Sequence, residues 1–345
     1  MDYHIDYAMR SPRDRDFLET VEGMFFCVTG YLHPPHCITA YLKYSPVSEG
    51  KWKRNDTYYR RELTHYHVHV ISSTISWLHS HHPHYVHFCP IRNITMSMVP
   101  RSLISRYYLP EQRLQRLLDS ASDSLEKKVV AFIEDLQEAT ALFSTDFGIT
   151  GSILIGLHNP QFSDIDLIVY GKDNSLQVKS VLPEISSVTG LEAAKKEEWI
   201  SHKMEIFHFS RKEAELFAER KWNYGYYDST YFSIHPTRTD AEIHESYGQV
   251  IYTDRGVIHL TARITDSSES LFLPAYYGLE PLEIVEGESV EVTWLVSFEG
   301  IYCDVFQEGD IIEVRGRLEQ VNGSYRVVMG TLSVQDQYIH LLSTE

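Results

Sequence analysis

The 345-residue sequence predicts an α+β protein, with a mixed-sheet core flanked by an N-terminal β-rich segment and a C-terminal β-barrel. Three observations support this prediction. Short apolar runs separated by turns fill the first part of the chain, a helical period of three and four residues follows, and β alternation returns from about residue 247. A chain of this length is expected to form two or three domains. We place them at residues 1–105, 106–245 and 246–345.

The N-terminal segment is expected to begin with two neighbouring strands, at residues 23–30 and 37–44. Eight of the 18 histidines follow, between His65 and His87. In a strand, alternate residues such as His65, His67 and His69 share one face, but they lie about 6 to 7 Å apart. We therefore interpret this row as a half-exposed strand and the histidines around Pro83 as a loop. The sequence leaves metal binding by the cluster open.

The middle segment changes to a helical pattern. Apolar residues recur at steps of three and four from Leu114 to Leu136, which predicts an amphipathic helix or a pair of helices. We expect this apolar stripe to cover the sheet of the core. The run 147–149 is predicted to be the first strand of that sheet, and 163–170 is predicted to be the next one.

The central motif begins where the first of these strands ends. Gly151 and Ser152 can offer unpaired backbone amides and a hydroxyl to a phosphate. Asp164 and Asp166 are alternate residues of the second strand, so their side chains are expected to point the same way. Paired carboxylates beside a phosphate-binding turn suit Mg²⁺ or Mn²⁺, which prefer oxygen ligands.

This pattern resembles the Gly-Ser plus Asp-x-Asp signature of the DNA polymerase beta-like nucleotidyltransferase superfamily. More loosely, the flanking stretches RDFLET and GDIIEVRGRLE resemble uncharacterised archaeal proteins predicted to be nucleotidyltransferases. The resemblance implies a nucleoside triphosphate substrate, ATP among them. It also implies that Gly151 and Ser152 hold its phosphates, and that Asp164 and Asp166 are catalytic residues and metal ligands.

The same superfamily usually adds a third carboxylate on a later strand. The candidates here are Glu205, in an expected strand at 203–209, and Asp228, which is equally natural as a turn residue. We prefer Glu205. Arg220 and Lys221 follow an expected helix that begins after Ser210, and with Arg238 they are candidate contacts for a triphosphate. The alternative for each of these cations is a solvated charge or an ion pair.

The last segment has the strand and turn pattern of a small barrel. Asn322-Gly323 is typical of a hairpin turn, and residues 308–318 resemble the strand and turn pattern of OB-like barrels. Residues 281–320 contain ten Asp or Glu against two Arg. Because a single-strand groove needs the opposite charge balance, we interpret the barrel as a scaffold or protein-contact domain.

The formal net charge of −17 also argues against an extended nucleic-acid substrate. We therefore expect a small-molecule or protein acceptor. No apolar run is long enough to span a bilayer, and the first 20 residues lack a signal segment, so a cytoplasmic protein without a membrane partner is expected. The prediction is a Mg²⁺-dependent nucleotidyltransferase. The alternative is a catalytically inactive protein of the same fold that senses nucleotides or binds proteins.

Overall fold

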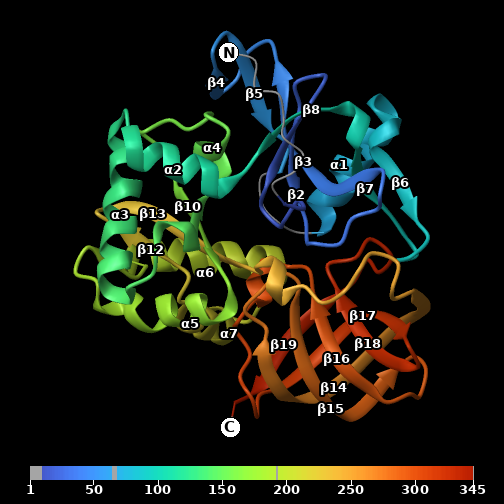
Figure 1. The fold of residues 1–345 in the computed structure, drawn as a ribbon. Coiled ribbons are helices and arrows are strands. Elements are labelled where there is room, and N and C mark those ends of the chain that lie inside the picture. Colours follow the sequence, from blue (N-terminus) through green and yellow to red (C-terminus); the bar gives the residue numbers. More distant parts are fainter. Residues whose placement is uncertain (1–9, 64–67, 192, 345) are drawn as a thin grey trace.

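The computed structural model describes residues 10–63, 68–191 and 193–344, and its strands form three separate β-sheets (Figure 1). We call them the N-terminal, central and C-terminal sheets. Helices pack against the central sheet, and the N-terminal and C-terminal sheets lie beside it. The prediction of a mixed α/β protein is confirmed. The domain boundaries at residues 105 and 245 stay a prediction.

The N-terminal sheet is antiparallel throughout, with strands in the order β4-β5-β3-β2-β1-β8, while β7 pairs with β3 and β6 with β7. The two strands expected at its start are β2 and β3, which pair as predicted. The strands are β1 (Phe17–Thr20), β2 (Phe25–Val28), β3 (Cys37–Val47), β4 (Trp52–Arg54), β5 (Thr57–Arg61), β6 (Val86–Cys89), β7 (Ile94–Pro100) and β8 (Ile104–Tyr108).

The histidine-rich part of this segment differs from the prediction. Residues 64–67, with His65 and His67, lie outside the described residues. From Val68 the chain forms helix α1 (Val68–His81) rather than a strand, and a 3₁₀ turn, η1 (Pro83–Tyr85), follows at once. Leu78 and Tyr85 are buried in the core of the N-terminal sheet. The spacing of four from Thr74 to Leu78, both buried, is the helical period that outweighs the alternation of histidines.

The central sheet has the order β11-β12-β13-β10-β9, with β10 and β13 parallel and the other pairs antiparallel. Its apolar residues share a core with two helices, α2 and α3. The predicted apolar stripe therefore belongs to a pair of helices, and its expected packing on the sheet is confirmed. The elements are α2 (Pro110–Ser120), α3 (Ser124–Thr140), β9 (Phe147–Ile149), α4 (Gly151–Leu154), β10 (Ile165–Tyr170), α5 (Lys172–Val181), β11 (Val188–Thr189), β12 (Tyr224–Tyr227) and β13 (Thr230–Thr237).

Helices α6 (Ala193–Phe207) and α7 (Arg211–Arg220) lie between β11 and β12 in the chain, and both pack in the core of the C-terminal sheet. The prediction of a strand at residues 203–209 is wrong, because most of this segment belongs to α6. Ile200 and Phe207, seven residues apart, both face the core of the C-terminal sheet. That spacing is two turns of a helix, and it decides the local conformation. Ser210 caps α7 as predicted, and Glu213 completes the capping box.

The C-terminal sheet is linked into a ring by its pairings. β14, β15, β16, β18 and β17 are successive neighbours, and β17 pairs again with β14. Only β16 and β18 are parallel. The strands are β14 (Tyr252–Glu269), β15 (Ala275–Glu286), β16 (Val292–Ser297), β17 (Ile311–Val321), β18 (Ser324–Met329) and β19 (Tyr338–Ser343). Across the described residues, no helix is long and apolar enough to cross a membrane.

Candidate functional site

The central motif is formed where β9 leads into α4. Ile149 pairs with Leu167 of β10, and the amide of Thr150 donates a hydrogen bond to the carbonyl oxygen of Asp166 at 2.9 Å. Gly151 then takes a positive φ of 64°. A Cβ at this position would lie 2.1 Å from Oδ2 of Asp166. Only glycine provides both the backbone conformation and the space for the carboxylate.

Ser152 is buried on the same turn. Among the residues that the structure describes, its Oγ has no hydrogen-bond partner. A buried hydroxyl without a partner is costly, and a phosphate oxygen would satisfy it. The helix α4 is held from the other side by the N-terminal sheet, because Leu154 and Leu157 share a core with Phe25 and Tyr44.

Asp164 directly precedes β10, and Asp166 is the second residue of that strand. The neighbouring charge of Asp166, followed by burial, raises the pKa of Asp164, so the two carboxylates are close in space. Burial also acts to raise the pKa of Asp166, but interactions with His235 and Ser233 outweigh it and hold that pKa below its ordinary value. A divalent cation would relieve the repulsion between the two carboxylates.

The strand beside the pair is β13, and Asp166 is aligned with Ser233 in their parallel register. Ser233 donates its hydroxyl proton to Oδ1 of Asp166 at 2.5 Å, and its Oγ lies 2.9 Å from Nε2 of His235. Since the serine has one proton to give, the second contact requires a hydrogen on Nε2. Burial, with the nearby charge of Arg15, lowers the pKa of His235 to about 4. The imidazole is therefore neutral near pH 7 and orients the serine.

The third carboxylate expected from the resemblance is not on this strand, because residues 230–237 include no Asp or Glu. Glu205 lies exposed on helix α6 rather than on a strand. Asp228 lies exposed in the turn between β12 and β13, with a positive φ of 43°. The turn interpretation of Asp228 is the one that fits this conformation. The face of β13 beside the pair instead presents Ser233 and His235.

The predicted phosphate contacts Arg220 and Lys221 face another part of the molecule. Arg220 forms an ion pair with Asp310 at 2.5 Å, and both side chains are nearly buried. Lys221 donates to the carbonyl oxygens of Gly300 and Cys303. Both cations therefore fasten the end of α7 to the C-terminal sheet. For Arg220, the structure shows the ion pair that the sequence left open as the alternative to a triphosphate contact. Arg238 is likewise paired, with Glu269 of β14.

The positive charges beside the aspartates come from the N-terminal sheet, which sequence reasoning missed. Arg61 and Lys43 both act to lower the pKa of Asp164, and Arg15 and Asp166 also interact electrostatically. Lys43 lies on β3 and is almost fully buried. Burial, followed by the charge of Arg61, lowers the pKa of Lys43 to about 7. The position of Lys43 within the apolar run of a strand is a weak sequence signal for a charge beside the aspartates. The residues around Arg15 and Arg61 in the sequence give no such signal.

These features together fit a metal-bound triphosphate. Two adjacent carboxylates provide the oxygen ligands that Mg²⁺ prefers. Ser152 provides a buried hydroxyl in need of a partner, and Gly151, which has no Cβ, makes room for the carboxylate of Asp166. The cations of the N-terminal sheet balance the negative charge that phosphates would bring.

Comparison with known proteins supports the same interpretation. A protein of Methanocaldococcus jannaschii described only as uncharacterised is 28% identical over 336 residues, covering 92% of this chain and 95% of that protein. No solved structure matches the chain. The family model described as "Nucleotidyltransferase domain" matches residues 127–224, which include Gly151, Ser152 and both aspartates. The resemblance to polymerase beta-like nucleotidyltransferases is confirmed at the level of this match, which covers residues 127–224.

Proposed function

We propose that this protein transfers a nucleotidyl group from a nucleoside triphosphate to an acceptor, in a reaction that depends on Mg²⁺ or Mn²⁺. The nucleotidyltransferase domain supports nucleotidyl transfer in general. The observation that carries the more specific proposal is the close pair Asp164 and Asp166, with the carboxylate of Asp166 packed against the turn at Gly151. Bound Mg²⁺ would neutralise phosphate charge and orient the triphosphate.

The protein's own residues have separable tasks in this proposal. Asp164 and Asp166 hold the metal, and the Gly151-Ser152 turn binds phosphate oxygens. Ser233 fixes one oxygen of Asp166 by its hydrogen bond, which leaves Oδ2 directed toward the turn. The N-terminal sheet supplies the buried amine of Lys43 next to the pair, and this amine is a cation when it is protonated. Such pre-oriented groups bind the triphosphate without reorganisation.

We propose a small-molecule or protein acceptor rather than an extended nucleic acid. The net charge of −17 favours this choice. A hollow of about 440 Å³ beside β4 and β5 is a candidate place for a small acceptor. It is lined by Lys51, Trp52 and Arg61, and Arg61 also acts on Asp164.

We also propose that the C-terminal sheet is the OB-like barrel expected from the sequence. The ring of pairings through β14, β15, β16, β18 and β17 supports this. In this proposal its role is that of a scaffold, because its core is shared with helices α6 and α7.

Binding of a labelled, non-hydrolysable triphosphate tests the metal site. We expect Mg²⁺-dependent binding by the unmodified chain and its loss in the double variant Asp164→Asn with Asp166→Asn. Unchanged binding by the double variant would contradict the assignment. Incubation of the chain with labelled triphosphate and separated small-molecule, protein and RNA fractions of a cell extract then tests transfer. Label in the first or second fraction supports the proposal. Binding without transfer to any fraction would favour the inactive alternative.

A further inference from the structure

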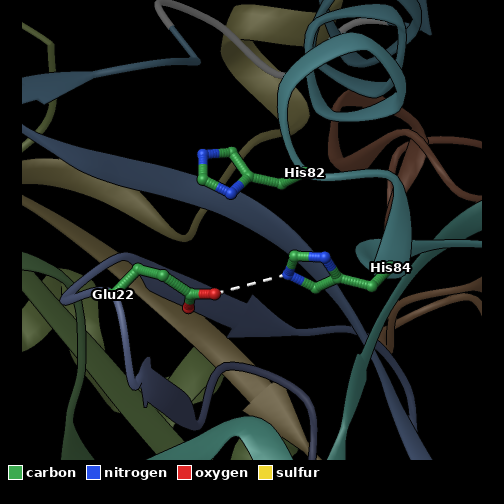
Figure 2. Close-up of side chains that lie close together, drawn as sticks. All are labelled: Glu22, His82 and His84. Atoms are coloured by element: carbon green, nitrogen blue, oxygen red, sulfur yellow. Dashed lines mark ion pairs between the residues drawn. The ribbon is translucent and has the colours of Figure 1, made fainter.

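Two histidines of the N-terminal segment meet a glutamate that is distant in the sequence. Glu22 lies in the turn between β1 and β2, while His82 and His84 flank Pro83 at the start of η1. Each of the three offers one ligand atom, and these atoms all lie within 4.8 Å of one another. Figure 2 shows the carboxylate of Glu22 facing the imidazole of His84 along the dashed ion pair, with the imidazole of His82 near both. The meeting depends on tertiary packing, so the histidine spacing alone does not reveal it.

The distances within this group match the coordination of a small transition-metal ion. Nε2 of His84 lies 3.3 Å from Oε1 of Glu22. Two ligands at zinc bond lengths of about 2.0–2.1 Å in a tetrahedral arrangement lie about 3.3 Å apart. Two of the three ligand atoms therefore already have the required separation. His82 is partly exposed, so a rotation of its side chain can bring its ring closer to the ligand atoms of Glu22 and His84.

The surroundings hold the group in place. Tyr85 is fully buried and donates its hydroxyl proton to Oε2 of Glu22 at 2.5 Å, which leaves Oε1 for the metal. Such hydrogen bonds to a ligating carboxylate orient it and raise metal affinity. The ring of His84 packs on Tyr85 at 4.4 Å between centroids, and that of His82 lies 5.4 Å from Trp77.

A second group with similar spacing lacks these properties. In this group Asp123 accepts hydrogen bonds from the first amides of α3, and Glu126 is paired with Arg113. His158 is hydrogen-bonded to Asp123. The carboxylates of this second group are already engaged by a helix start and a guanidinium, whereas no arginine or lysine in the described part of the chain pairs with Glu22.

We propose that Glu22, His82 and His84 bind a divalent transition-metal ion, with Zn²⁺ as the best fit. Two imidazoles and one carboxylate suit Zn²⁺, whereas the oxygen-only pair of the nucleotidyltransferase domain suits Mg²⁺. The bound ion fastens η1 to the turn between β1 and β2. The site is independent of nucleotidyl transfer and leaves at least one coordination position for water.

Zinc retention by untagged protein tests this proposal. The chain is prepared in the Asp164→Asn, Asp166→Asn background, so that the other carboxylate pair cannot contribute. It is loaded with Zn²⁺, dialysed and measured by atomic spectrometry. We expect about one ion per chain. We expect this ion to be lost in His82→Ala and in His84→Ala, and to be retained in His79→Ala, which removes an exposed imidazole from α1.

A conservative variant tests the supporting hydrogen bond. Tyr85→Phe keeps the buried ring and removes only the hydroxyl, so we expect zinc affinity to fall about 10- to 100-fold. Circular dichroism of the metal-free variants checks that each remains folded. Cobalt loading gives a visible spectrum of tetrahedral coordination that should vanish in His84→Ala. Equal zinc retention by His84→Ala and His79→Ala, or no retained ion in the parent background, would overturn the proposal.

Discussion

The substitution Gly151→Ala separates the two reasons for a glycine at the central turn. The first reason is the positive φ of 64°, which costs an L-residue about 1–2 kcal/mol. The second is space, because the new Cβ would lie 2.1 Å from Oδ2 of Asp166 and 3.0 Å from its Cγ. Relief of such overpacking costs about 1–3 kcal/mol. We expect Gly151→Ala to lower the free energy of unfolding by about 2–5 kcal/mol in total.

Gly156→Ala is a matched control at the other end of the same segment. Gly156 has a φ of 69°, and a Cβ there meets nothing within 4 Å. This variant should therefore show only the backbone cost of about 1–2 kcal/mol. Urea unfolding measures both variants. The difference between them, about 1–3 kcal/mol, isolates the contact with Asp166.

The same pair of variants tests the site. Displacement of Asp166 in Gly151→Ala should weaken Mg²⁺-dependent triphosphate binding at least tenfold, which corresponds to about 1.4 kcal/mol. Gly156→Ala should bind nearly as well as the unmodified chain. Calorimetric titration under conditions where both are folded provides the comparison. Equal stability and equal affinity of the two variants would refute the reasoning that Gly151 makes room for the carboxylate.

Three further outcomes follow from other contacts. Ser233→Ala removes the hydroxyl that holds Asp166, so Mg²⁺-dependent triphosphate affinity should fall several-fold in titrations, whereas unchanged affinity would contradict a positioning role. Arg220→Met leaves the nearly buried Asp310 without its ion pair, so urea unfolding should show a loss of about 3 kcal/mol; a selective loss of triphosphate affinity without destabilisation would restore Arg220 as a nucleotide contact. Burial acts to raise the pKa of Glu213, but hydrogen bonds from the α7 cap and from β19 hold this pKa at about 2. The contribution of ionised Glu213 to the free energy of unfolding is therefore fully present above pH 4.5 and is lost as the pH falls toward 2. Glu213→Gln should cost about 1–2 kcal/mol at pH 7 after solvent screening, and less at pH 3; a pH-independent loss would argue against this linkage.

Much of the architecture was predictable because it depends on local periodicity. The steps of three and four between Leu114 and Leu136 predicted one amphipathic helix or a pair of helices; the structure has the pair, and its expected packing on the central sheet is confirmed. Residues 203–209 show where such reasoning failed. The segment alternates like a strand, but Ile200 and Phe207 lie two helical turns apart and both contact the core of the C-terminal sheet. Burial against a distant sheet outweighed the local pattern.

The sequence by itself determined the centre of the candidate site. Gly151, Ser152, Asp164 and Asp166 are close along the chain, and two adjacent strands bring them together through short-range geometry. Only the tertiary structure decided what surrounds them. It placed Lys43 beside the pair, engaged Arg220 with the C-terminal sheet, and aligned Ser233 where a third carboxylate was expected. Charges interact through space, and the partners of a long side chain depend on how distant sheets pack, which residue spacing does not encode.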